Sequence, residues 1–177
     1  MKQLIVYSSQ GGNTKKLAEE IFRQLPDEKE IKPIAGAPDP SGYDIVCMGF
    51  WFKAGQPDPA AQDYLKKCGN CKVFLFASHG AAPGSEHARM GMNKAIELTG
   101  GATVAGTFSC QGEVPAKVME TAAGKDPQPP WLKDAPNAKG HPNGNDFMNL
   151  SDALIKAGLK TVATPKGGSV VDGSHAM

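Results

Sequence analysis

The sequence predicts a three-layer α/β/α fold around a parallel sheet of five strands, doubly wound with right-handed crossovers. Two features predict this class. Short apolar runs without clean alternation, typical of strands buried on both faces, alternate along the chain with amphipathic helical patterns. The length of 177 residues supports one domain with a sizeable core rather than two domains.

Four apolar runs are the predicted buried strands, and one weaker run is a predicted edge strand. The four runs cover residues 4–7, 45–50, 73–77 and 103–108. The weaker run, residues 31–34, contains Pro33, which cannot donate a hydrogen bond to a neighbouring strand. It is therefore expected at an edge of the sheet.

Helical patterns fill the intervals between these strands. Residues 13–25 place an apolar stripe on one side of a helix, and Asp58-Pro59 is typical of a helix start. Ser85 is expected to cap a third helix, and residues 145–157 form a last one, with a short helix near Val118. The domain that these elements build is expected to span residues 1–160.

Two segments depart from the alternation of strand and helix. Residues 124–145 hold five prolines and three glycines and are expected to form a long irregular excursion. The Gly-rich residues 161–177 are expected to be a flexible tail, with residues 173–177 typical of vector-derived sequence.

Composition excludes several classes of function. Lys plus Arg number 19 and Asp plus Glu 18, so the net charge of +1 provides no field to attract a nucleic acid or an anionic membrane. The N-terminus turns polar at Ser8, too early for a secretory signal, and no apolar run approaches a membrane span. Four scattered cysteines suit a reducing compartment, so a cytoplasmic location is expected.

The most informative stretch runs from a buried strand through Ser8-Ser9-Gln10-Gly11-Gly12 into a helix that begins at Asn13-Thr14. Such a turn directs backbone N–H groups and hydroxyls to one point beside the positive end of a helix, where a phosphate binds. The Gly-Lys-Ser/Thr ending of a triphosphate loop and the Gly-x-Gly-x-x-Gly of a dinucleotide site are both missing. The alternative is a plain glycine turn without a ligand.

This stretch resembles the first loop of the flavodoxins, which has an aromatic residue, a hydroxyl-rich turn and Gly-Asn-Thr at the start of the first helix. The matching residues are Tyr7, Ser9, Gly12, Asn13 and Thr14, while Gly11 stands where many members have a hydroxyl residue. The resemblance implies a flavodoxin-like sandwich with strand order 2-1-3-4-5 and Pro33 in the edge strand. It also implies flavin mononucleotide (FMN) as the cofactor, with Ser9, Gln10, Gly11, Gly12, Asn13 and Thr14 around its phosphate.

In the flavodoxins the loops after the third and fourth strands hold the flavin ring. The resemblance therefore assigns Phe50, Trp51, Phe52, Lys53 and Gly55 from one loop, and Ser78, His79, Gly80 and Ala81 from the other. Trp51 is the predicted stacking partner of the ring, although a Trp that completes the core is the alternative. Lys53 would stabilise a reduced, anionic flavin unless it simply faces water, and Gly55 would let a peptide near the flavin rotate.

These features predict an electron-transfer flavoprotein that passes one or two electrons to a dedicated protein partner. The near-neutral charge argues against a general carrier, since such flavodoxins are strongly acidic. An FMN-dependent NAD(P)H:quinone-type oxidoreductase is the alternative. No acid, base, nucleophile or metal-ligand set is predicted, and Cys68 and Cys71, although spaced as in redox motifs, lack the helix start that activates such thiols. The oligomeric state stays open.

Overall fold

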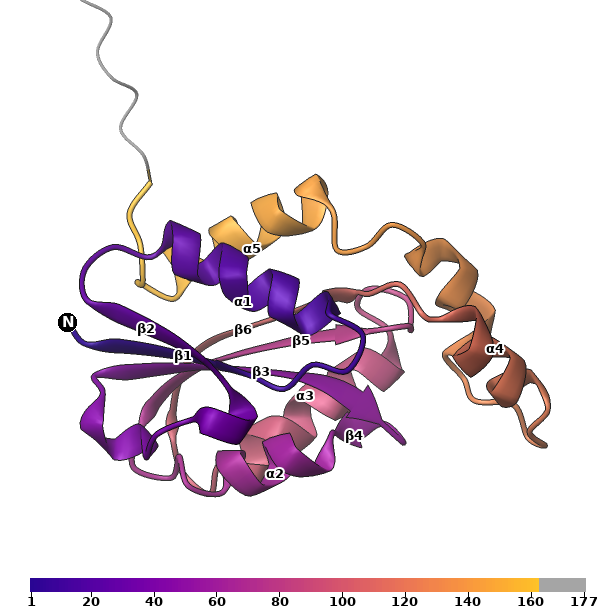
Figure 1. Ribbon diagram of the computed structural model, residues 1–177, viewed down its shortest axis with the longest axis horizontal. Coiled ribbons are helices and arrows are strands. Elements are labelled where there is room, and N and C mark those ends of the chain that lie inside the picture. The colour runs from indigo at the N-terminus through magenta and orange to yellow at the C-terminus, as the bar shows by residue number, and fades with distance from the viewer. Residues whose placement is uncertain (163–177) are drawn as a thin grey trace, which may run out of the picture.

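The computed structural model describes residues 1–162 as an open, mostly parallel sheet between two layers of helices (Figure 1). Its strands are β1 (Gln3–Tyr7), β2 (Lys29–Pro33), β3 (Ile45–Lys53), β4 (Gln56–Pro57), β5 (Lys72–His79) and β6 (Thr103–Gln111). Its α-helices are α1 (Asn13–Gln24), α2 (Pro59–Leu65), α3 (Glu86–Leu98), α4 (Ala116–Ala123) and α5 (Gly144–Lys156). Short 3-10 helices cover Ile34–Gly36, Pro40–Gly42 and Leu132–Ala138. Most of the predicted tail lies outside the described residues.

The parallel strands follow the order β2-β1-β3-β5-β6, and β4 pairs with β3 in the antiparallel sense. This order is the predicted 2-1-3-4-5, with the small β4 added. The predicted edge strand is confirmed, because β2 ends at Pro33 and pairs only with β1 among the described strands. A proline is tolerated there because its missing N–H faces away from the ladder.

Two apolar layers sandwich the sheet. One cluster of buried side chains packs beneath α1 and α5 and includes Ile5, Leu17 and Leu154. The other packs beneath α2 and α3 and includes Leu4, Leu65 and Ala95. Figure 1 shows the two pairs of helices on opposite faces. No helix among residues 1–162 is both long and apolar enough to cross a membrane.

The predicted excursion is more ordered than the proline content suggested. It contains the 3-10 helix Leu132–Ala138, which packs against α4, and Ala135 and Ala138 in that helix are buried. Figure 1 shows α4 and the chain around it beyond the carboxyl ends of the strands. We call residues 112–143, which connect β6 to α5, the end segment.

Candidate functional site

The turn from β1 into α1 presents backbone N–H groups that have no acceptor within the described part of the chain. Gly12 adopts a φ of 93°, a conformation that glycine takes without strain. The Oγ of Ser9 accepts hydrogen bonds from the N–H groups of Gly12 (3.1 Å) and Lys15 (3.3 Å). The N–H groups of Asn13 and Thr14 find no acceptor among residues 1–162, although Thr14 is only 1% exposed. An anion at this helix start would satisfy them.

A hydroxyl pair fixes this turn to the middle of the sheet. Thr14 Oγ1 lies 2.9 Å from Ser78 Oγ and 3.4 Å from the carbonyl oxygen of Phe50, to which it donates. Because this hydroxyl is already paired inside the domain, Thr14 offers a ligand its backbone N–H. The expected role of Thr14 at the phosphate therefore rests on its main chain.

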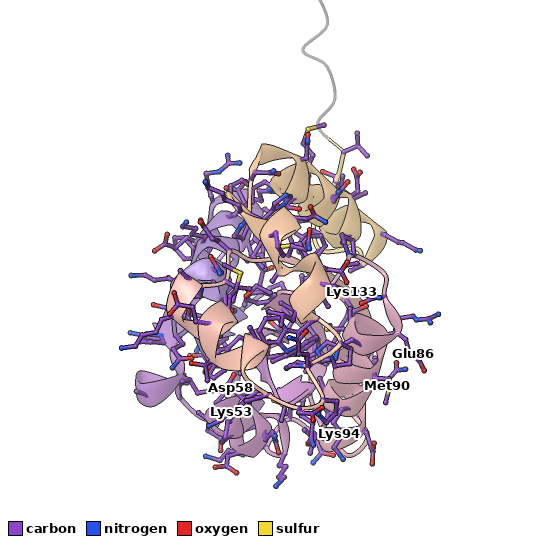
Figure 2. All side chains as sticks on the ribbon, turned by 90° about the vertical axis from the view of Figure 1, so that its right-hand side faces the viewer. Lys53, Asp58, Glu86, Met90, Lys94 and Lys133 are labelled. Carbon is purple, nitrogen blue, oxygen red and sulfur yellow. The ribbon has the colours of Figure 1, made fainter. Side chains whose placement is uncertain are left out.

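Asp58 is a site residue that sequence reasoning missed. It is 2% exposed, and its carboxylate accepts hydrogen bonds from the Ser8 hydroxyl (2.7 Å), the Ala61 N–H (3.2 Å) and the Trp51 N–H (3.4 Å). The Asp-Pro pair predicted only that Asp58 caps the helix, which is its contact with the Ala61 N–H. The contacts to Ser8 and Trp51 join β1, β3 and α2 at the carboxyl edge of the sheet, where Figure 2 labels Asp58 near Lys53.

The strand boundaries predicted on either side of this edge are wrong. The third strand continues past Phe50 to Lys53, so Trp51, expected just beyond the strand end, lies inside β3. Ala54 (φ 53°) and Gly55 (φ 75°) then form a two-residue turn, after which Gln56 and Pro57 pair back onto β3. Positive φ at both central residues fits the twist of a tight hairpin. Likewise, β5 continues to His79, so Ser78 and His79 belong to the strand rather than to a loop.

The sheet sorts the predicted ring contacts onto its two faces, because side chains alternate along each strand. Trp51 is the register partner of Ser78. By alternation they share the face of Cys47 and Phe76, which is the α1 and α5 face. Phe50, Phe52 and His79 point to the α2 and α3 face instead. The α1 face therefore brings together the turn after β1, Trp51 and Ser78. Phe50, Phe52 and His79 lie on the other side of the sheet.

The group on the α3 face forms a closed aromatic cluster. Phe52 stacks on His79 with ring centroids 5.4 Å apart and a 9° interplanar angle, and its edge meets His87. Phe50 is fully buried, so its side chain belongs to the core. A Cβ on Gly91 of α3 would lie 2.5 Å from the Phe52 ring, which shows how closely that ring rests on the helix. We call Phe52, His79 and His87 the aromatic cluster.

His79 is a neutral imidazole in this cluster. Its Nδ1 lies 3.1 Å from the carbonyl oxygen of Ala81, which can only accept, so the proton sits on Nδ1. Its Nε2 is buried and has no hydrogen-bond partner among residues 1–162. Burial, more than the nearby His87, lowers the pKa of His79 to about 4 despite the hydrogen bond to Ala81.

The remaining predicted residues lie around the same edge. Gln10 and Gly11 are exposed in the turn, Ala81 is buried, and Gly80 is half-buried. Lys53 is exposed at the end of β3. The side-chain amide of Asn13 donates to the carbonyl oxygen of Glu113 (3.0 Å), which connects the turn to the end segment.

Cys68 and Cys71 lie at the opposite end of the sheet, just before β5 begins at Lys72. Both thiols are buried, and the Cys71 N–H donates to the carbonyl oxygen of Cys68 (2.9 Å) in a turn. Burial raises the pKa of Cys68 to about 12, so it is a neutral thiol at physiological pH. Their position and burial are typical of core residues.

A parallel α/β sheet with an anion-binding turn after its first strand defines a mononucleotide-binding class of domain. The family model described as a flavodoxin domain matches residues 4–155, and this chain belongs to that family. Family membership confirms the predicted flavodoxin-like protein, for which FMN is the cofactor.

Individual relatives agree with this assignment. A flavodoxin-like domain-containing protein BilS of Clostridioides difficile is 34% identical over 120 residues, covering 64% of this chain and 68% of that protein. A short-chain flavodoxin associated with a non-canonical PDU bacterial microcompartment superposes with a TM-score of 0.61 at 12% identity, covering 89% and 97% of the two chains. A flavoprotein of Lactobacillus acidophilus, solved in complex with FMN, superposes with a TM-score of 0.51 at 22% identity. The match covers 61% of this chain and 92% of that protein.

The residues present fit FMN. The buried, unpaired N–H of Thr14 and the N–H of Asn13 suit its phosphate. Trp51 is half-buried beside Ser78, and Gly80, just beyond the end of β5, has the Trp131 indole beside it. The half-buried indole of Trp51 is a flat apolar surface of the kind on which a flavin ring stacks.

Proposed function

We propose that this chain is an FMN-binding electron-transfer flavoprotein that serves a dedicated protein partner. One observation supports it above the others. The N–H groups of Asn13 and Thr14, the first two residues of α1, have no acceptor among the described residues. FMN when bound supplies one- and two-electron transfer, while the chain binds, orients and shields it. No side chain needs to act as an acid, base or nucleophile for this role.

The proposed site divides into a phosphate part and a ring part. The phosphate part is the turn Ser9, Gln10, Gly11, Gly12, Asn13 and Thr14. The ring part on the α1 face is Trp51, Ser78 and Gly80, with Lys53 and Gly55 at the hairpin rim. Phe50, Phe52, His79 and Ala81 support the strand ends from beneath, which is a smaller role than direct contact.

A dedicated partner suits the charge of this chain. The net charge is +1, so no strong field would steer it to a basic reductase. Electrons would leave at the carboxyl edge, where the end segment extends beyond the strand ends (Figure 1). The partner is therefore expected to be a cytoplasmic redox protein that recognises this segment by shape rather than by bulk charge.

Comparing FMN with riboflavin tests the function, because the two ligands differ only by the phosphate. The apoprotein should bind FMN at least tenfold more tightly than riboflavin, since about 1.5–3 kcal/mol is typical of a hydrogen bond to a charged group. Ser9→Ala should weaken FMN about tenfold and leave riboflavin unchanged. Ser41→Ala, at the amino edge before β3, is the control and should alter neither. Equal affinities of the parent protein for both ligands would refute the phosphate site.

Steady-state turnover separates the carrier from the oxidoreductase alternative. A carrier with FMN bound should oxidise NADPH or NADH only when a separate reductase is added. Rapid oxidation of either nucleotide by the purified holoprotein and a quinone would establish the alternative instead.

A further inference from the structure

Trp131 lies outside every segment that was expected to hold a ligand. It is half-buried in the end segment, immediately before the 3-10 helix Leu132–Ala138. A Cβ placed on Gly80 would lie 3.3 Å from Cε3 of the Trp131 indole and 2.8 Å from Cγ2 of Val114. The indole therefore rests on the bare main chain just beyond β5.

Hydrogen bonds hold the end segment in this position. The Gly112 N–H donates to the carbonyl oxygen of His79 (2.8 Å), and the Gln111 side-chain amide donates to the carbonyl oxygen of Asp134 (3.4 Å). The Ala135 N–H donates to the carbonyl oxygen of Trp131 itself (3.2 Å). The main chain that carries the indole is thus held both at the strand ends and within the 3-10 helix.

Trp131 shares a face of the sheet with Trp51. Gly80 follows Ser78 by two residues, so the direction in which its Cβ would point, toward Trp131, is the face of Ser78 and its register partner Trp51. Across the sheet, Phe52 and His79 already stack on each other. The α1 face therefore has two half-buried indoles, one on β3 and one beyond β5.

We propose that Trp131 is a binding residue of the flavin ring, so that the end segment supplies one wall of the cofactor site. This inference rests on the proposed FMN function. A half-buried indole that rests on glycine main chain offers a flat apolar surface of the kind on which an aromatic ligand stacks. Trp51 and Trp131 contact the ring from different parts of the chain, and the end segment covers the ring on the side away from β3. Figure 2, which looks onto the strand ends, shows the end segment in front, with Lys133 marking the residues after Trp131.

Affinities for FMN and riboflavin test this contact in full-length protein. Losing a ring contact weakens both ligands by the same factor, whereas losing a phosphate contact weakens FMN alone. Trp131→Leu should weaken both about tenfold, as is typical for loss of an aromatic stacking contact, and Trp131→Phe should restore most of the affinity. Val118→Ala, exposed on α4 in the same segment, is the matched control and should bind both ligands like the parent.

The outcomes separate this inference from the proposed function. If the parent fails to bind FMN, the function falls and the inference with it. If the parent binds FMN and Trp131→Leu binds each of the two ligands as tightly as the parent does, only the inference is overturned. Weakening of FMN without riboflavin also overturns it. Should Trp131→Leu fold poorly, the visible circular dichroism of FMN bound to Trp131→Phe decides: an altered spectrum supports the contact, and a spectrum identical to that of the parent overturns it.

Discussion

The two faces of the sheet differ sharply at its carboxyl edge. On the α1 face, the N–H groups of Asn13 and Thr14 find no acceptor among the described residues, and Trp51 is only half-buried. On the α3 face, Phe52 and His79 stack on each other, and Phe52 fills the space above Gly91. The α1 face therefore has groups that can still bind a ligand. On the α3 face most side chains already pack against one another.

This difference explains why aromatic residues near a predicted site are a poor guide to ligand contact by themselves. Trp51 and Phe52 are neighbours, but alternation along β3 sends them to opposite faces. Changes on the α3 face should therefore alter folding stability, and changes on the α1 face should alter ligand affinity. Each prediction below tests that division.

The largest expected effect is the pH dependence of stability that His79 causes. Its pKa is lowered from about 6.5 in the unfolded chain to about 4 in the folded protein. Between these values the unfolded chain binds the proton and the folded chain does not, so the free energy of unfolding falls as pH decreases from 6.5 to 4. The loss should total about 3 kcal/mol and level off below pH 4. Urea unfolding at several pH values measures it.

His79→Asn should flatten this pH dependence between pH 6.5 and 4 whatever its effect at neutral pH. His87→Gln is the comparison variant, because burial also lowers the pKa of His87 but that ring is only half-buried. It should remove a smaller part of the slope. An unchanged slope in His79→Asn would show that the aromatic cluster does not bury its imidazole as described.

Gly91→Ala should destabilise the protein, contrary to the usual effect of this change inside a helix. An alanine there would normally add up to about 1 kcal/mol. Here its Cβ would lie 2.5 Å from the stacked Phe52 ring, so we expect a net loss of about 1–3 kcal/mol. In a Phe52→Leu background the sign should reverse, since the smaller side chain leaves room. Thermal unfolding of the four proteins decides, and FMN affinity should stay close to that of each background.

Thr14→Val tests the limit of this division, because the Thr14 hydroxyl lies on the α1 face but is paired inside the domain. Valine keeps the volume and the backbone N–H but removes the hydroxyl that pairs with Ser78 and Phe50. The free energy of unfolding should fall by about 1–2 kcal/mol. The ratio of FMN affinity to riboflavin affinity should stay as in the parent. The exposed Thr121→Val should change neither quantity. A selective loss of FMN affinity in Thr14→Val would mean that the hydroxyl, rather than the N–H, contacts the phosphate.

Much of this fold could be predicted from the sequence because its signals are local. Apolar runs without alternation marked β1, β3, β5 and β6, and Pro33 marked the edge strand. The turn after β1 was equally clear, since glycine, hydroxyl and amide residues crowd into one strand-to-helix junction. The tight hairpin after β3 was missed because alanine rarely adopts a positive φ, so Ala54, at a φ of 53°, does not predict a turn.

The rest of the site depends on contacts between residues far apart in the chain. Asp58 meets Ser8 fifty positions away, and Trp131 meets Gly80 only because the end segment folds back over β5. Neither contact has a local pattern. The proline content of the end segment predicted an irregular excursion, but it could not indicate the 3-10 helix Leu132–Ala138 or the side chain placed over the strand ends.

The smallest expected effect concerns Lys53, which is exposed at the end of β3. Alternation places it on the same side of β3 as Trp51, so its charge would favour an added electron on a ring at the α1 face. A unit charge about 10 Å away in water-like surroundings shifts a one-electron potential by roughly 20 mV. Lys53→Gln should lower the potentials of bound FMN by about that amount at low salt, and by much less at high salt, because the screening length falls to about 3 Å at 1 M. Lys72→Gln, at the amino end of β5, should leave them unchanged in the same spectroelectrochemical titration. Equal shifts in the two variants would mean that net charge, rather than position at the carboxyl edge, controls the potential.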